Sequence, residues 1–110
     1  MEEKRKSQRY AVTLPGSYTC EGSEPDTQCI IVELSHGGLR LKSKEKIPFG
    51  STVTVGLACP ALPKPASFTV TIRWSKQLYD DPEFEYLAGG EFADIDENVR
   101  EQLISHAHTV

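Results

Sequence analysis

Residues 67–74 read Ser-Phe-Thr-Val-Thr-Ile-Arg-Trp, and this stretch decides the fold class. Every second residue is apolar, which is the period of a β-strand with one buried face and one solvated face. The apolar residues that are expected to share the buried face are Phe68, Val70, Ile72 and Trp74. An α-helix would instead repeat its apolar residues every three or four positions, so the stretch indicates a strand.

Similar signals on both sides of this stretch predict five more strands. Pro15-Gly16 interrupts the first of them, and Cys29–Leu34 is apolar on both faces except for Glu33. In the last, Gly89-Gly90 indicates a bulge or a close backbone approach. The five segments span residues 10–20, 29–34, 39–41, 53–57 and 84–92. Short strands separated by turns favour an all-β fold, here a six-stranded antiparallel β-barrel, because closure removes exposed sheet edges.

The end of the sequence has a different period. Asp94 followed by Glu97 fits a capping box, and apolar residues then recur at helical spacing. We therefore expect one C-terminal helix over Ile95–His106, packed against the barrel. The organisation predicted is a flexible basic arm over residues 1–9 and a single domain over residues 10–110.

Composition limits the kind of protein. A chain of 110 residues with 38% hydrophobic and 25% charged residues forms one modest core. The sequence has no apolar run of ~20 residues and no signal-peptide pattern, which predicts a cytoplasmic protein without membrane insertion. The net charge of -4 makes nucleic-acid binding an unfavoured reading. Three cysteines without a CxxC spacing predict free thiols and no metal site.

Charge is distributed unevenly along the chain. Residues 4–9 carry four positive charges and no acid, whereas residues 80–101 carry nine acids and one base. The acidic segment is expected to be a solvated face. The basic segment has two readings, a solubilising terminus or a binding arm.

Two motifs favour the binding arm. Arg5-Lys6-Ser7-Gln8-Arg9 is an R-x-x-x-R sequence, and Glu33-Leu-Ser-His-Gly-Gly38 is close to [D/N]-x-S-x-x-G. With Trp74 late in a strand and Gly89-Gly90-Glu91-Phe92 before the helix, the sequence resembles the PilZ family over nearly its whole length. PilZ domains are bacterial domains that bind the second messenger cyclic di-GMP.

The resemblance implies a PilZ-like barrel that binds cyclic di-GMP as its ligand, with no other cofactor. The residues that it places in the site are Arg5, Arg9, Glu33, Ser35 and Gly38, with Lys4, His36, Gly37 and Trp74 as secondary candidates. An arginine fork suits the O6 and N7 acceptors of guanine and also phosphate. The family prefers Asp or Asn where this chain has Glu33, which is one methylene longer.

Each of these residues also has a purely structural interpretation. Ser35–Gly38 fits a tight turn, and Trp74 fits the barrel core or rim. Glu33 can pair with Arg40, Lys42 or Arg9 instead of a ligand.

The function that we predict is a receptor whose arm closes over cyclic di-GMP and relays the signal to a separate protein partner. The alternative is a non-binding adaptor that acts only through protein contacts. The sequence contains no nucleophile elbow, P-loop or metal-ligand cluster, so an enzyme is not expected.

Overall fold

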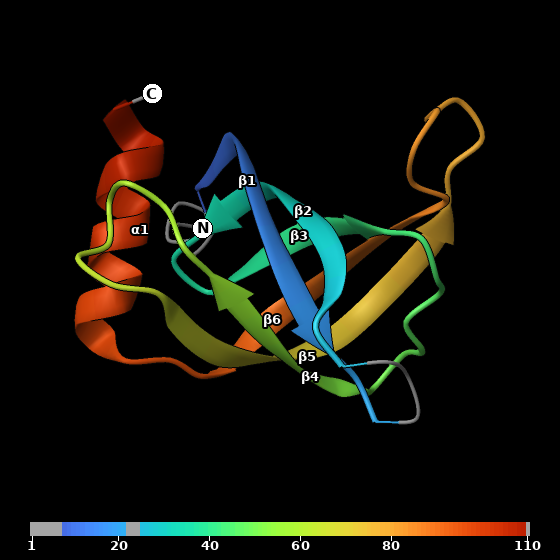
Figure 1. Cartoon of the computed structure of the whole chain (residues 1–110), viewed down its shortest axis with the longest axis horizontal. Coiled ribbons are helices and arrows are strands. Elements are labelled where there is room, and N and C mark those ends of the chain that lie inside the picture. The colour runs from blue at the N-terminus through green and yellow to red at the C-terminus, as the bar shows by residue number, and fades with distance from the viewer. Residues whose placement is uncertain (1–7, 22–24, 110) are drawn as a thin grey trace, which may run out of the picture.

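The computed structural model describes residues 8–21 and 25–109, which form a closed antiparallel β-barrel and one helix (Figure 1). Around the barrel the strands follow the order β1-β2-β3-β6-β5-β4. The elements in chain order are β1 (Arg9–Thr19), β2 (Thr27–Ser35), β3 (Gly38–Ser43), β4 (Thr52–Leu57), β5 (Ala66–Gln77), β6 (Tyr86–Asp94) and α1 (Glu97–Thr109). The predicted fold class, a mainly β six-stranded barrel with a C-terminal helix, is therefore confirmed.

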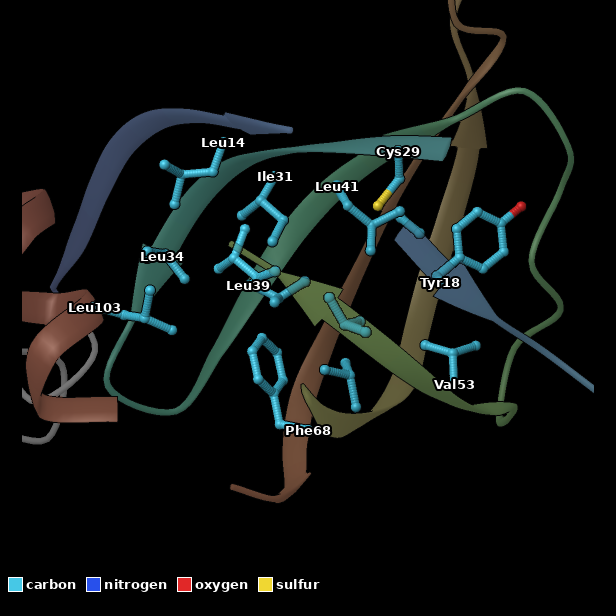
Figure 2. Packing of buried hydrophobic residues seen from close by; sticks show 14 of the residues in the cluster. Leu14, Tyr18, Cys29, Ile31, Leu34, Leu39, Leu41, Val53, Phe68 and Leu103 are labelled. Carbon is cyan, nitrogen blue, oxygen red and sulfur yellow. The ribbon is translucent and has the colours of Figure 1, made fainter. Parts of the chain in front are cut away.

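Alternating side chains from all six strands fill the barrel interior (Figure 2). Phe68, Val70 and Ile72 of the stretch that identified the fold are all buried. Leu103 and Ala107 of α1 join the same cluster, and the helix contacts β1 and β2. The helix thus covers one end of the barrel, away from the β5–β6 loop (Figure 1).

The barrel closes where β1 meets β4, over Gly16–Thr19 only. A Cβ atom on Gly16 would lie 2.7 Å from the carbonyl oxygen of Gly56, so this close approach requires glycine. Pro15, which has no N–H to donate, is the last residue before that pairing begins. The predicted interruption at Pro15-Gly16 is wrong, because β1 continues through both residues.

A β-bulge in β5 changes the face on which Trp74 lies. Ile72 pairs with Gly90 and Trp74 pairs with Gly89, so Arg73 is an extra residue on β5. Each further residue along a strand reverses the face, and one inserted residue therefore moves Trp74 to the outer face. The prediction that Trp74 shares the buried face of Ile72 is wrong: its side chain is half-buried on the outside of the barrel.

The helix starts and ends later than predicted, at Glu97 and Thr109. Its N-cap is Asp96, whose Oδ1 accepts the backbone N–H groups of Asn98 and Val99 at 2.8 and 3.4 Å. Asp94 still belongs to β6, where it pairs with Thr69, so the predicted Asp94 cap is wrong. Asp96 takes this role because the residue directly before a helix is the one that reaches its first free N–H groups.

The predicted free cysteines are confirmed, and Cys20 and Cys29 are buried. Burial raises the pKa of the Cys29 thiol to about 11, which keeps it protonated. Over the described residues, no helix is long and apolar enough to span a bilayer.

The predicted solvated acidic face is confirmed except at Asp81, because the other eight acids of residues 80–101 are exposed. Asp81 accepts a hydrogen bond from Lys42 Nζ at 2.7 Å and is only 14% exposed. Glu91 pairs with Arg73. Lys42 and Arg73 therefore balance part of the local negative charge.

Candidate ligand-binding site

A cleft of about 550 Å³ lies on the outer face of the barrel, beside the β2–β3 turn. Its volume falls within the range typical of small-molecule sites. Strands β1, β2, β3, β5 and β6 contribute to its walls, together with the start of α1. The charged residues that line it are Arg9, Arg40, Arg73, Arg100, Glu33 and Glu91.

Strand register builds one wall and the floor of this cleft. Glu33 pairs with Arg40 across β2 and β3, Arg40 with Gly89 across β3 and β6, and Gly89 with Trp74 across β6 and β5. These residues therefore form one row on the outer face. Arg40 Nε lies 3.0 Å from Glu33 Oε1, which confirms one of the ion pairs predicted for Glu33.

Gly89 allows the Trp74 indole to lie directly on the β6 backbone. A Cβ at Gly89 would be 2.5 Å from the Trp74 Nε1 and Cε2 atoms, far inside ordinary contact distance. The Cζ atom of Arg40 lies 5.1 Å from the indole centroid, a cation–π distance. The predicted close backbone approach at Gly89-Gly90 is confirmed, and it holds a flat aromatic ring on β6 with the Arg40 guanidinium over it.

The β2–β3 turn forms the adjoining wall. The Gly38 N–H donates to Ser35 Oγ at 3.2 Å, and the Phe92 N–H donates to the Gly37 carbonyl at 2.9 Å. A Cβ at Gly38 would collide with the carbonyl oxygen of Gly90, so only glycine lets β3 and β6 approach so closely here. The tight-turn interpretation of Ser35–Gly38 is thus confirmed, and the same turn lines the cleft.

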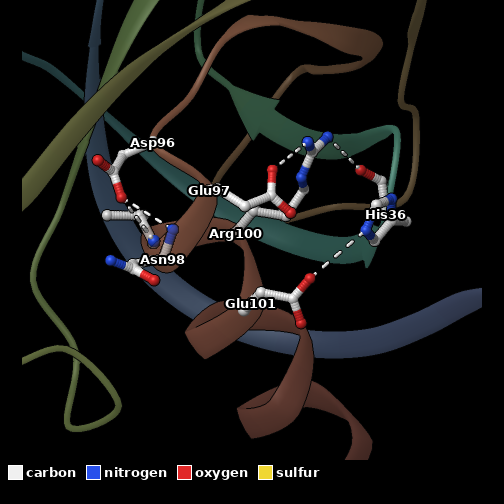
Figure 3. Close-up of polar contacts among 7 residues, drawn as sticks. His36, Asp96, Glu97, Asn98, Arg100 and Glu101 are labelled. Carbon is white, nitrogen blue, oxygen red and sulfur yellow. Dashed lines mark hydrogen bonds and ion pairs between the residues drawn. The ribbon is translucent and has the colours of Figure 1, made fainter.

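Side chains of α1 hold this turn against the helix (Figure 3). Arg100 Nη1 donates to the His36 carbonyl at 3.1 Å, and Nη2 donates to Glu97 at 2.7 Å. This hydrogen bond to Arg100 lowers the pKa of Glu97. The His36 ring lies 3.7 Å from Glu101, and His36 is not among the residues that line the cleft.

His36, Glu97 and Glu101 form a cluster with metal-ligating atoms within 4.8 Å of one another. All three side chains are exposed. The Arg100 guanidinium already donates a hydrogen bond to the Glu97 carboxylate, and its positive charge would repel a metal cation bound there. The arrangement favours ion pairs between turn and helix over a metal site.

The structure brings together some of the predicted site residues. Arg9 is the first residue of β1 and pairs with Ser35, and its Nε lies 3.9 Å from Glu33 Oε1. Glu33, Ser35, Gly37, Gly38 and Trp74 also line the cleft. Lys4 and Arg5 lie outside the described residues.

Sequence reasoning did not assign a ligand role to Arg40, Arg73 or Arg100. For Arg40 a signal existed, because it alternates with the buried Leu39 and Leu41 and so faces outward. The same signal existed for Arg73, which follows the buried Ile72 on β5, whereas Arg100 reaches the cleft only through the docking of α1.

The sequence matches the PilZ domain family model over residues 3–108. The chain belongs to the PilZ domain family. PilZ domains are binding or adaptor proteins and not enzymes, and they are generally cyclic di-GMP receptors.

Two solved structures have the same fold. The inhibitor of motility (MotI/DgrA) of Bacillus subtilis matches at a TM-score of 0.73 and 14% identity, covering 96% of this chain and 50% of that one. A tetrameric PilZ domain protein of Xanthomonas campestris matches at a TM-score of 0.52 and 19% identity. The match covers 81% of this chain and 47% of that one. This PilZ chain thus spans about half the length of these proteins. No protein of curated function matches it significantly.

Proposed function

We propose that the cleft is a binding site for cyclic di-GMP. The observation that carries the proposal is its charge: four arginines and two glutamates line the cleft, an excess of two positive charges. The whole chain has a net charge of -4, so this excess is local. Cyclic di-GMP is a dianion with two guanine bases, and the excess matches its two phosphates.

The chemistry of the walls suits both parts of this ligand. Arginine forks bind phosphate oxygens or the O6/N7 edge of guanine through paired hydrogen bonds. The Trp74 indole offers a surface on which a base can stack, flanked by the Arg40 guanidinium. A Cβ at Gly37 would meet nothing within 4 Å, so the turn backbone is open to close approach there.

The basic arm completes the proposed site. Arg9 lies at the cleft, and its register partner is Ser35 of the turn. Lys4 and Arg5 precede it in the sequence, so we propose that the arm folds over the bound ligand. Ordering an arm costs conformational entropy, which makes it a ligand-dependent switch that a protein partner can read.

One observation favours the alternative, a non-binding adaptor. Glu33 stands where the family prefers Asp or Asn, and its carboxylate contacts Arg40 at 3.0 Å and Arg9 at 3.9 Å. A ligand must displace or share these contacts. In the adaptor, Glu33 neutralises the arginines permanently, and the barrel acts through protein contacts alone.

Isothermal titration calorimetry with cyclic di-GMP separates the two functions, with cyclic di-AMP and GTP as controls. A receptor gives selective, saturable heat that disappears in Arg5→Ala/Arg9→Ala and persists in Lys76→Ala, which removes a cation from β5 outside the cleft. Silence from a protein shown to be folded by circular dichroism refutes the receptor and leaves the adaptor.

A further inference from the structure

A second arginine–glutamate pair lies in the same cleft, outside the motifs that identified the site. Arg73 Nε and Nη2 donate to Glu91 Oε1 at 3.2 and 3.0 Å. Both side chains line the cleft, and 53% and 63% of their surfaces are exposed. Both are therefore open to a ligand.

The bulge in β5 places Trp74 on the same outer face as Arg73. Arg73 is the extra residue between Ile72 and Trp74, and bulges commonly redirect a side chain toward a site. Glu91 follows Gly90 on β6 and pairs with Gly38 of the turn. The second pair is thus connected to the wall that carries the family motif.

The two pairs have the same chemical composition and lie on neighbouring strands of the same cleft. Glu33 and Arg40 belong to β2 and β3, whereas Arg73 and Glu91 belong to β5 and β6. Arg40 and Arg73 are thus two strand spacings apart, about 10 Å. Between them lies β6, where the Trp74 indole rests on Gly89.

The hydrogen-bond donors and acceptors of each pair complement those of guanine and do not match those of adenine. Guanine presents acceptors at O6 and N7, which an arginine donor satisfies, and N–H donors at N1 and N2, which a carboxylate accepts. Adenine presents an amino donor where guanine has O6, and an acceptor at N1. Adenine keeps the N7 acceptor, but it presents a donor to the second arginine N–H and an acceptor to the carboxylate, so one arginine donor and the carboxylate remain unpaired.

We propose that Arg73 and Glu91 recognise the second guanine of cyclic di-GMP, while Glu33 and Arg40 recognise the first. This inference rests on the proposed function. A ligand with two identical bases meets two chemically identical pairs. The pair in β5 and β6 then makes the site selective for two guanines over one.

The test compares cyclic di-GMP with 3′,3′-cyclic GMP-AMP, which keeps both phosphates and one guanine. The wild type should bind cyclic di-GMP more tightly by about 5- to 150-fold, the discrimination expected of one bidentate base contact. In Arg73→Ala/Glu91→Ala, which leaves the net charge unchanged, the ratio should fall to about twofold, the statistical advantage of two equivalent orientations. In Arg73→Lys the affinity ratio should also fall most of the way toward twofold, because lysine keeps the positive charge but cannot donate two parallel hydrogen bonds to one base edge.

The outcomes separate this inference from the proposed function. If the wild type binds neither dinucleotide, both are wrong. If it binds both equally, or if the double variant keeps the wild-type ratio, cyclic di-GMP binding stands and the second guanine site is wrong. Lys76→Ala should keep the wild-type ratio, which shows that loss of a distant β5 cation does not change selectivity.

Discussion

Replacement of Gly89 by alanine tests the geometry of the cleft floor without any ligand. The new methyl group would lie 2.5–2.6 Å from three indole atoms of Trp74, whereas ordinary contacts begin near 3.4 Å. The indole must therefore retreat by about 1 Å, an overpacking that costs about 1–3 kcal/mol. If the ring swings into solvent instead, the loss of about 100 Å² of apolar contact costs about 2.5 kcal/mol. Either route predicts a loss of about 2 kcal/mol.

Urea unfolding and fluorescence measure this effect together. A loss of about 2 kcal/mol lowers the urea midpoint by about 1 M for a domain of this size. Trp74 is the single tryptophan of the chain, so the emission spectrum reports this site alone. The emission of Gly89→Ala should shift to longer wavelength, because the displaced indole meets more water.

Gly37→Ala is the matched control. A Cβ at Gly37 meets nothing within 4 Å, and its φ is not positive. We expect this variant to keep the wild-type emission and to be unchanged or stabilised by less than about 1 kcal/mol. Wild-type stability and emission in Gly89→Ala would show that the indole does not rest on the β6 backbone, and the proposed stacking surface would be refuted.

Three further predictions concern other parts of the molecule. Arg9→Ala should weaken cyclic di-GMP binding in calorimetry by about 1.5–3 kcal/mol, the value of a charge-assisted contact, and an unchanged affinity contradicts the arm mechanism. Asp96→Ala should lower the free energy of unfolding by about 0.5–2 kcal/mol through loss of the N-cap, whereas equal effects of Asp96→Ala and Asp94→Ala would contradict the cap assignment. The hydrogen bond from Lys42 lowers the pKa of Asp81 from 3.8 to about 2, so its stabilising effect is complete above pH 3.8 and is lost as the pH falls through about 2. The stability difference between wild type and Asp81→Asn in urea should therefore shrink over that pH interval, and a constant difference refutes the ion pair as its cause.

The sequence predicted the barrel because the alternation of apolar and polar residues along each strand shows which side chains face the core. Val53, Val55 and Leu57, for example, are all buried, as their spacing required. The motif residues around Ser35 were located for a related reason. A short turn between two paired strands keeps residues that are close in sequence close in space.

The sequence did not predict what depends on one inserted residue or on tertiary docking. Nothing in Ile72-Arg73-Trp74 itself marks a bulge, yet the bulge decides that Trp74 faces outward beside Arg73. The only sequence signal for the bulge was the pair of glycines on the neighbouring strand, Gly89 and Gly90. Arg100 reaches the turn through the packing of α1, which no local pattern encodes.

The arrangement of the arginines explains how their side chains can be held in position before an anion binds and still remain available to it. Arg40 and Arg73 are oriented by carboxylates, and Arg100 by the His36 carbonyl and Glu97. Solvent-exposed ion pairs contribute only about 0–1 kcal/mol, whereas a charge-assisted hydrogen bond to a ligand contributes about 1.5–3 kcal/mol. The carboxylates therefore restrict the arginine rotamers before binding, yet they are weak enough to be displaced. Because guanine itself supplies donors for a carboxylate, the displaced Glu33 and Glu91 gain new partners, which a simple phosphate would not provide.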